Sequence, residues 1–125
     1  VRNEVIGPAG PTTASRMDQF MEMMLAELGI MGTIGKAERG ESAVQTIKKY
    51  QSVYLSAVGG AAYLVSKAIT SSKVVAFPEL GMEAIYEFEV KDMPVMVSID
   101  TQGKSIYSEA PSRWKNKSIP INSLK

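Results

Sequence analysis

The 125-residue chain contains no cysteine and no histidine. Their absence excludes a disulfide framework, a zinc finger, a cysteine nucleophile and a Ser-His-Asp triad. It also excludes an iron–sulfur cluster ligated by this chain alone, because such clusters are held mainly by cysteine thiolates. Any chemistry must therefore use hydroxyl, carboxylate, ammonium or guanidinium side chains and backbone amides, or groups supplied by a partner.

Long apolar runs are absent as well. No stretch reaches the roughly 18 to 20 apolar residues that a bilayer-spanning helix needs, and Gly59 and Gly60 interrupt the longest candidate. Apolar residues make up 45% of the chain and charged residues 22%, which is the balance of one globular domain rather than of a disordered or fibrous chain. No secretory signal is visible, so we expect a cytoplasmic location and no membrane partner.

Basic residues outnumber acidic ones only at the C-terminus. Residues 1–110 carry ten basic and thirteen acidic side chains, whereas the last fifteen residues carry four basic side chains and no acidic one. A nucleic-acid-binding domain usually has a basic body with interleaved aromatic residues, but Trp114 is the one aromatic residue of this tail. The pattern favours a solvated or partner-docking basic tail over residues 111–125 and argues against nucleic-acid binding.

The periodicity of apolar residues predicts helices that alternate with strands. Apolar positions between 17 and 28 recur at helical spacing, with Thr12 or Thr13 able to cap the helix and Gly29 placed to end it. Further helices are predicted at residues 41–50 and 61–69, and strands at residues 4–6, 30–35, 53–58 and 74–77. This alternation predicts a mainly parallel sheet covered by helices.

The alternation of helix and strand ends after Pro78. Residues 85–90 alternate apolar with polar, the period of a half-exposed strand, and residues 94–100 have the pattern of a buried strand. A turn at residues 101–104 then predicts a C-terminal β-hairpin with residues 105–107. The expected fold class is α/β, with a mixed, largely parallel sheet flanked by helices.

Two segments at predicted strand and helix ends could bind an anion. Free backbone amides at the start of the first helix attract negative charge, and Thr12 and Arg16 lie four residues apart, on one face of its first turn. Lys36 and Arg39 follow a predicted strand, at the edge where parallel sheets bind ligands. An ordinary helix cap and a solvated charged loop are the alternative interpretations of these two segments.

A third segment, around Gly59 and Gly60, forms another strand-to-helix turn, although close helix–sheet packing would also favour glycine there. We expect all three segments at the same edge of one sheet. Together they favour a site for a small anion such as a dicarboxylate, and the residues themselves name no reaction. Glu79 and Glu83 remain open as candidates for a general acid.

The same segments resemble one known family. Residues 10–18 read GPTTASRMD and resemble the GPTT-x-x-RM[DE] signature of class I, iron–sulfur-dependent fumarate hydratases and L-tartrate dehydratases. Residues 35–39 (GKAER) resemble their GKG-x-R loop, and residues 58–62 and 79–85 resemble two further blocks. Residues 97–100 with Gly103 are similar to the family's closing hairpin. The blocks follow the family's order over almost the whole chain, which resembles a β subunit or the C-terminal domain of a single-chain member.

The resemblance implies a swivelling β/β/α-type domain over residues 1–110, with a further segment upstream. It implies reversible hydration of fumarate to L-malate, carried out together with an α subunit. A four-iron four-sulfur cluster would be ligated by three cysteines of that α subunit and not by this chain, leaving one iron to act as a Lewis acid. The implied assembly is a homo-oligomer or a heterotetramer that binds a small dicarboxylate.

Residue matches to the family imply individual roles. Thr12 stands where the family has its proposed proton-abstracting base, and a hydroxyl needs neighbouring cations to lower its pKa for that role. Arg16 and Lys36 stand where it has carboxylate-binding groups, and we expect Thr13 and Arg39 to assist in substrate binding. Ala37 replaces a glycine that is common in the loop.

Two alternative functions stay open. The loop and the block at residues 79–85 look closer to the fumarases, which favours fumarate, while dehydration of L-tartrate to oxaloacetate is the second candidate within the same class. The chain could instead be a non-catalytic anion-binding or assembly module. The presence of Thr12, Arg16 and Lys36 argues against that last alternative.

Overall fold

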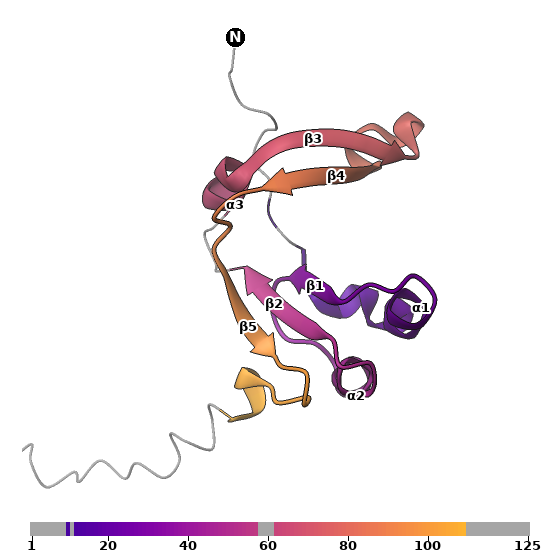
Figure 1. Ribbon diagram of the computed structural model, residues 1–125, viewed down its shortest axis with the longest axis vertical. Helices are drawn as coiled ribbons and strands as arrows, with labels where there is room; N and C mark the ends of the chain where they lie inside the picture. The colour runs from indigo at the N-terminus through magenta and orange to yellow at the C-terminus, as the bar shows by residue number, and fades with distance from the viewer. Residues whose placement is uncertain (1–9, 11, 58–61, 110–125) are drawn as a thin grey trace, which may run out of the picture.

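The computed structural model describes residues 10, 12–57 and 62–109, which form a sheet with two helices and a separate two-stranded ribbon (Figure 1). The predicted strand at residues 4–6, the glycines Gly59 and Gly60 and the basic tail at residues 111–125 lie outside the described residues. No helix among the described residues has both the length and the apolar character needed to cross a membrane.

The first helical region has two parts. A 3-10 helix, η1 (Ala14–Phe20), continues directly into α1 (Met21–Ala26). Thr13 is the N-cap residue of η1, but its side chain makes no capping hydrogen bond. Gly29, with a φ of 66°, follows the end of α1, where a left-handed residue favours glycine. The predicted helix is therefore confirmed, with a tighter first half and without a Thr13 side-chain cap.

Three strands form a mixed sheet in the order β1 (Gly32–Gly35), β2 (Val53–Ala57) and β5 (Val95–Ile99). β1 and β2 are parallel and are connected through α2 (Glu41–Lys49), whereas β5 is antiparallel to β2. The core lies where η1, α1 and α2 pack on this sheet. Its fully buried residues come from both layers, namely Met21, Ala43, Ile47, Tyr54 and Ile99.

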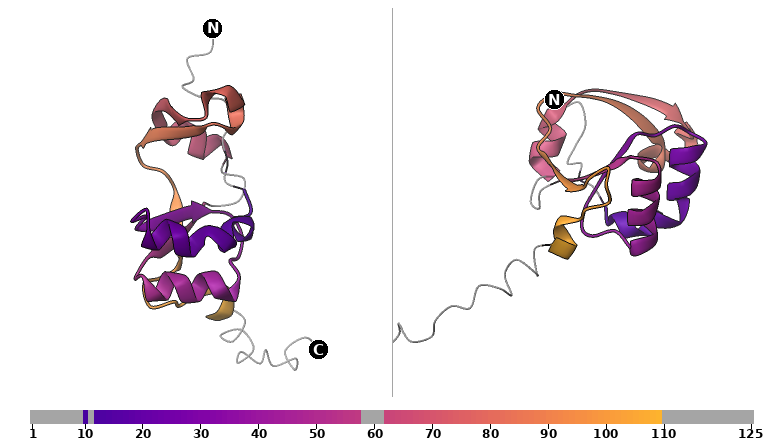
Figure 2. Two further views of the ribbon diagram at one scale, coloured as in Figure 1. Left: turned by 90° about the vertical axis from the view of Figure 1, so that its right-hand side faces the viewer. Right: turned by 60° about the horizontal axis from the view of Figure 1, so that its bottom comes forward.

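A second unit follows β2. The helix α3 (Ala62–Ala68) leads directly into β3 (Ile69–Ala76), and β3 pairs antiparallel with β4 (Ile85–Val90) across a 3-10 helix, η2 (Pro78–Glu83). The views in Figure 2 show this ribbon standing apart from the three-stranded sheet. The expectation that residues 74–77 join the parallel sheet is therefore wrong. Phe77 and Gly81, with φ values of 55° and 59°, turn the chain back on itself.

The α/β class and the mixed sheet flanked by helices are confirmed, with two corrections of detail. Among the described strands, the three-stranded sheet has one parallel and one antiparallel pair, and the separate β3–β4 pair is also antiparallel, so the strands are not largely parallel. The expected C-terminal hairpin is reduced to a single antiparallel bridge between Ile99 and Ser105. Asp100 accepts hydrogen bonds from the amides of Gln102 and Lys104, which closes the chain into a tight turn before a short helix at residues 106–109.

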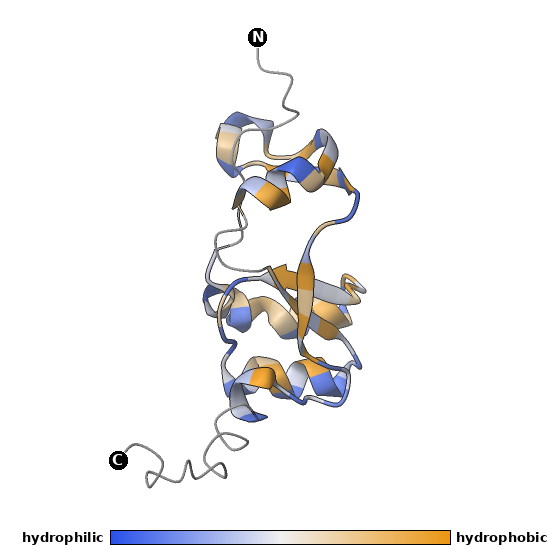
Figure 3. Ribbon diagram, turned by 90° about the vertical axis from the view of Figure 1, so that its left-hand side faces the viewer, coloured by the Kyte–Doolittle hydropathy of each residue, from blue (hydrophilic) through white to orange (hydrophobic). Residues whose placement is uncertain are grey.

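Many large apolar side chains are exposed on the strands. Figure 3 colours the ribbon diagram by hydropathy, and much of the strands is drawn in the orange of hydrophobic residues. On β5 three consecutive apolar side chains are at least one-third exposed, those of Val95, Met96 and Val97. The β3–β4 ribbon exposes five more apolar side chains, those of Val74, Val75, Ile85, Phe88 and Val90. An apolar surface of this extent is typical of an interface with another protein segment.

Candidate functional site

Two of the three predicted anion-binding segments lie side by side. The amide of Lys36 donates to the carbonyl of Thr12 at 3.2 Å, and the amide of Ala14 donates to the carbonyl of Lys36 at 2.9 Å. These two bonds form a parallel bridge between Thr13 and Lys36. The start of η1 is therefore joined to the carboxyl end of β1, and the prediction that the two segments meet at one edge of the sheet is confirmed.

The side chains expected to meet the substrate are accessible at this junction. Thr12, Arg16 and Lys36 are exposed, and Thr13 is half-buried. Within the described part of the chain, neither Arg16 nor Lys36 forms an ion pair or a side-chain hydrogen bond. Two exposed cations without an ion pair among the described residues therefore lie on the same two segments as Thr12 and Thr13, a donor set that suits a carboxylate.

The last residue of the third segment, Ala62, lies close to the start of the GPTT signature. A Cβ added to Gly10 would lie 3.2 Å from the Cβ of Ala62, the first residue of α3. Gly10 therefore brings the beginning of the signature against the beginning of α3. Ala62 is the one residue of the third segment, residues 58–62, that lies within the described part of the chain.

Gly35 explains how η1 can start so close to β1. A Cβ at this position would lie 2.9 Å from the Cβ of Ala14 and 3.2 Å from Cε2 of Tyr54. Atoms at such distances overlap, so any side chain would force the two segments apart. The glycine that begins the GKAER loop is required by close packing between β1, η1 and β2.

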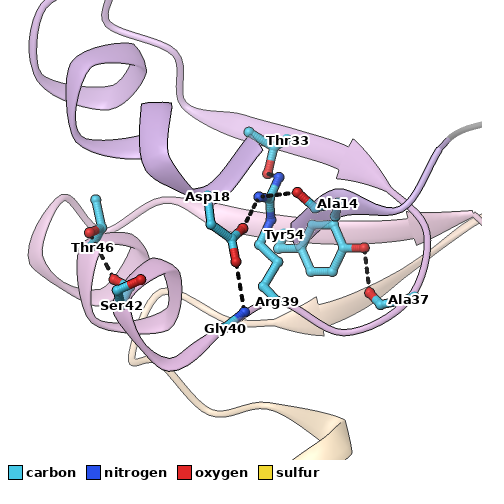
Figure 4. Close-up of polar contacts among 9 residues, drawn as sticks. All are labelled: Ala14, Asp18, Thr33, Ala37, Arg39, Gly40, Ser42, Thr46 and Tyr54. Carbon is cyan, nitrogen blue, oxygen red and sulfur yellow. Dashed lines mark hydrogen bonds and ion pairs between the residues drawn. The ribbon is translucent and has the colours of Figure 1, made fainter. Parts of the chain in front are cut away.

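Arg39 is placed unlike the other candidate residues, because its side chain points inward (Figure 4). It is only 6% exposed. Its Nη1 donates to Oδ1 of Asp18 at 2.7 Å and to the carbonyl of Ala14 at 3.2 Å. Its Nη2 donates to Oγ1 of Thr33 at 3.3 Å, and the guanidinium stacks over the ring of Tyr54 at 4.8 Å. A substrate carboxylate could reach Nη1 only by displacing Asp18, so direct substrate binding by Arg39 gains no support from the geometry.

Two residues that contact Arg39, namely Asp18 and Tyr54, were not among the predicted site residues. Asp18 uses both carboxylate oxygens, since Oδ2 accepts from the amide of Gly40 at 2.8 Å while Oδ1 accepts from Arg39. Asp18 occupies the acidic position that ends the GPTT-x-x-RM[DE] signature, so the sequence did carry a signal for it. Tyr54 lies in β2 with nothing in its strand pattern to set it apart. Its hydroxyl donates to the carbonyl of Ala37 at 2.7 Å.

The environment of Tyr54 also shifts its acidity. Burial raises the pKa of the Tyr54 hydroxyl above its ordinary value, and the neighbouring Arg39 guanidinium partly opposes this rise. The phenol is therefore neutral at physiological pH and acts as a hydrogen-bond donor within the loop.

A surface cavity of about 650 Å³ lies beside the loop, lined by residues that include Glu38, Arg39, Glu41 and Ser105. The charge of Arg39 is already paired with Asp18. The two carboxylates of the cavity repel a dianion. The junction of η1 and β1, rather than this cavity, is therefore the candidate dicarboxylate site.

The donor set of the chain does not fit an iron–sulfur cluster, because such clusters are held mainly by cysteine thiolates. The sequence has neither cysteine nor histidine, and the described residues contain no group of three or more potential His, Cys, Asp or Glu ligands. Glu79 and Glu83, the open general-acid candidates, are exposed on η2 at the turn of the ribbon.

Comparison with known proteins places these features in one family. Residues 1–110 match the family described as "Fumarase C-terminus". The chain is 38% identical over 104 residues to the aerobic class I fumarate hydratase of Escherichia coli, a match covering 82% of this chain and 19% of that protein. Fumarate hydratase 2 of Leishmania major is also 38% identical over 104 residues, covering 82% of this chain and 18% of that protein.

A shorter relative matches a larger share of its own length. The chain is 38% identical over 111 residues to a Methanocaldococcus jannaschii protein provisionally named L(+)-tartrate dehydratase subunit beta. That match covers 86% of this chain and 57% of the relative, so the chain spans little more than half of this protein and less than one fifth of the two fumarate hydratases. The chain belongs to the fumarase C-terminus family, the C-terminal or β domain of class I fumarate hydratases and their relatives.

Proposed function

We propose that this chain binds the dicarboxylate in a hydro-lyase that interconverts fumarate and L-malate together with an α-type partner. The observation that carries the proposal is the junction of η1 and β1, where Thr12, Arg16 and Lys36 are exposed on two segments joined by backbone hydrogen bonds. Substrates of this reaction are small dianions, which need cationic and hydroxyl donors of this kind. The names of the relatives supply the choice of fumarate.

The proposal assigns a role to each residue. Arg16 and Lys36 hold carboxylate oxygens and stabilise the negative charge that develops when a proton leaves the adjacent carbon. Thr12 transfers that proton: its ionised oxygen receives it in the malate-to-fumarate direction, while the hydroxyl group on the neighbouring carbon departs as hydroxide, for which the partner's cluster would supply a Lewis acid. In the hydration direction Thr12 returns the proton to carbon as hydroxide adds to the neighbouring one. The two cations favour the ionised form of the Thr12 hydroxyl, which a neutral environment would not. Thr13 contributes a further hydroxyl at the same junction.

The proposal requires a partner. The chain spans less than one fifth of the fumarate hydratases that it matches, and its exposed apolar strands suit a covering protein surface. Because this chain offers no thiolate or imidazole donor, the four-iron four-sulfur cluster that its family resemblance implies would be ligated by that partner. We infer an α component carrying the cluster cysteines, in a homo-oligomer or a heterotetramer.

The test is turnover by the complex formed when this chain is produced anaerobically with the cysteine-bearing component from the same source. We expect interconversion of fumarate and L-malate that is lost in air and is absent from either component alone. A complex that turns over neither fumarate, L-malate nor L-tartrate would overturn the proposal and favour a non-catalytic binding or assembly module.

L-Tartrate is the second candidate substrate, because the provisional name of the Methanocaldococcus relative is that of a tartrate dehydratase subunit. The same complex distinguishes the two substrates. Oxaloacetate formation from L-tartrate without malate turnover would keep the hydro-lyase class and replace the substrate.

A further inference from the structure

Asp18 and Arg39 connect the two segments that present the proposed substrate-binding residues. Asp18 lies two residues after Arg16 on η1, and Arg39 lies three residues after Lys36 on the loop that follows β1. Their ion pair is 2.7 Å long, and their side chains are only 13% and 4% exposed. Figure 4 shows the pair between the η1 helix and the loop, beside the ring of Tyr54.

The contacts of the pair hold the backbone on both sides. Arg39 also donates to the carbonyl of Ala14, and Asp18 also accepts from the amide of Gly40. Each side chain therefore fixes the main chain of the segment opposite to its own. Without them, the two backbone bonds at Lys36 are the hydrogen bonds that still join the start of η1 to this loop among the described residues.

Stability alone is a weak reason for this arrangement. Replacing a buried ion pair by apolar side chains of similar volume is often neutral or stabilising, because removing two charges from water is costly. Here an additional cost arises, because Nε of Arg39 is buried without a hydrogen-bond partner among the described residues. The pair is better explained by what it fixes, namely the register between two segments.

The ion pair also means that Arg39 adds little positive charge to the proposed binding site. Asp18 neutralises Arg39 internally, whereas Arg16 and Lys36 have no ion pair within the described part of the chain. The positive charge offered to a ligand therefore comes from Arg16 and Lys36, and the distance between those two side chains depends on the register of their segments.

We propose that Asp18 and Arg39 are positioning residues, which hold η1 and the loop after β1 in register so that Arg16 and Lys36 bind one dicarboxylate together. Neither residue touches the substrate. The kinetic part of the test rests on the proposed function, and a second readout is independent of it.

The kinetic test uses the assembled enzyme with Asp18→Asn, which keeps the shape of the side chain and removes its charge. Displacement of a binding group by about 1 Å can cost up to about 100-fold, so we expect KM for fumarate to rise by about tenfold or more. The matched control is Glu22→Gln, which breaks an ion pair of the same 2.7 Å length between α1 and α2 at an exposed position. We expect KM to stay unchanged in this control.

A double variant separates positioning from a merely structural effect. If Asp18 acts through Lys36, the rise in KM caused by Asp18→Asn should shrink to about threefold or less in a Lys36→Ala background, because the effects of coupled residues do not add. Additive effects, or a lower melting temperature with an unchanged KM, would overturn the proposal. If Asp18→Asn does not fold, Arg39→Lys is tested in its place, and we expect the same changes in KM with a smaller magnitude.

Amide hydrogen exchange of the full chain provides the readout that does not depend on turnover. Asp18→Asn should accelerate exchange at Lys36 and Gly40, and Glu22→Gln should not. If the wild-type complex has no hydro-lyase activity, the proposed function fails and exchange alone decides the positioning role. Unchanged protection at both amides would overturn it.

Discussion

The hydroxyl of Tyr54 donates a hydrogen bond of 2.7 Å to the carbonyl of Ala37, a residue that holds a left-handed backbone conformation with a φ of 65°. The bond ties the loop that carries Lys36 to the central strand of the sheet. The left-handed conformation explains why glycine is common at this position in the family pattern, because glycine adopts it without strain. This chain keeps the same conformation with alanine.

Ala37→Gly should therefore stabilise the chain. Removing the Cβ from a left-handed position relieves a strain of about 1 kcal/mol. Gly29→Ala is the matched control, because Gly29 has a φ of 66° and open space around its Cβ position. We expect it to destabilise the chain by a similar amount. Urea unfolding of the two variants measures both changes, and a destabilising Ala37→Gly would contradict this explanation of the loop.

Gly35→Ala should destabilise the chain by about 1–3 kcal/mol, as overpacking does in other cores. Its new methyl group would meet Ala14 at 2.9 Å. The double variant with Ala14→Gly should recover part of the loss, since one of the two colliding methyl groups is then absent. Equal stability of Gly35→Ala and wild type in thermal unfolding would show that η1 can shift away from β1 at no cost.

Tyr54 should make stability fall at alkaline pH. Burial raises the pKa of its hydroxyl in the folded chain above the ordinary value of 10.0. The folded state therefore favours the neutral phenol. The contribution of this preference to the free energy of unfolding is complete below pH 10 and is lost as the pH rises through the folded-state pKa.

Tyr54→Phe tests this dependence. At neutral pH the variant should be less stable by about 1 kcal/mol, the net value of a typical hydrogen bond such as the one to Ala37. Above pH 10 the difference in the free energy of unfolding between wild type and variant should become smaller. A constant difference in denaturant midpoints across the alkaline range would exclude Tyr54 as a source of the pH dependence.

Thr12→Ala should lower kcat of the assembled enzyme by about 100-fold or more, the usual contribution of a positioned proton-transfer group. KM should change much less. Thr12→Ser keeps the hydroxyl and serves as the control, with kcat expected within about tenfold of wild type. Loss of substrate binding with an unchanged kcat would instead make Thr12 a binding residue.

Arg16→Ala and Lys36→Ala should each raise KM for fumarate by about 10-fold to 100-fold, corresponding to about 1.5–3 kcal/mol for a hydrogen bond to a charged group. Lys73→Ala, on the exposed surface of β3, removes a cation away from the site and should leave KM unchanged. If all three variants raised KM equally, general electrostatic attraction rather than a defined site would explain the effect.

The local elements were predictable because their signals are local. The helical spacing of Met17 to Leu28, the left-handed Gly29 and the apolar runs of β1 and β2 each depend on neighbours in the sequence. The meeting of Thr12 with Lys36 was predictable in a different way. The start of a helix and the carboxyl end of a strand were expected at the same edge of one sheet, and the backbone bonds between the two segments confirm it.

The sequence by itself determined the absence of cysteine and histidine ligands, the α/β class and the family signature, and it supplied the residues that we propose to bind a dicarboxylate. Only the tertiary structure decided which partner each strand takes and which way each charged side chain faces. β3 pairs with β4 instead of joining the sheet, and Arg39 faces Asp18 instead of solvent. The physical reason is that strand pairing and ion pairing depend on residues distant in sequence. Periodicity records that a residue is apolar or charged, but not which distant group it will meet.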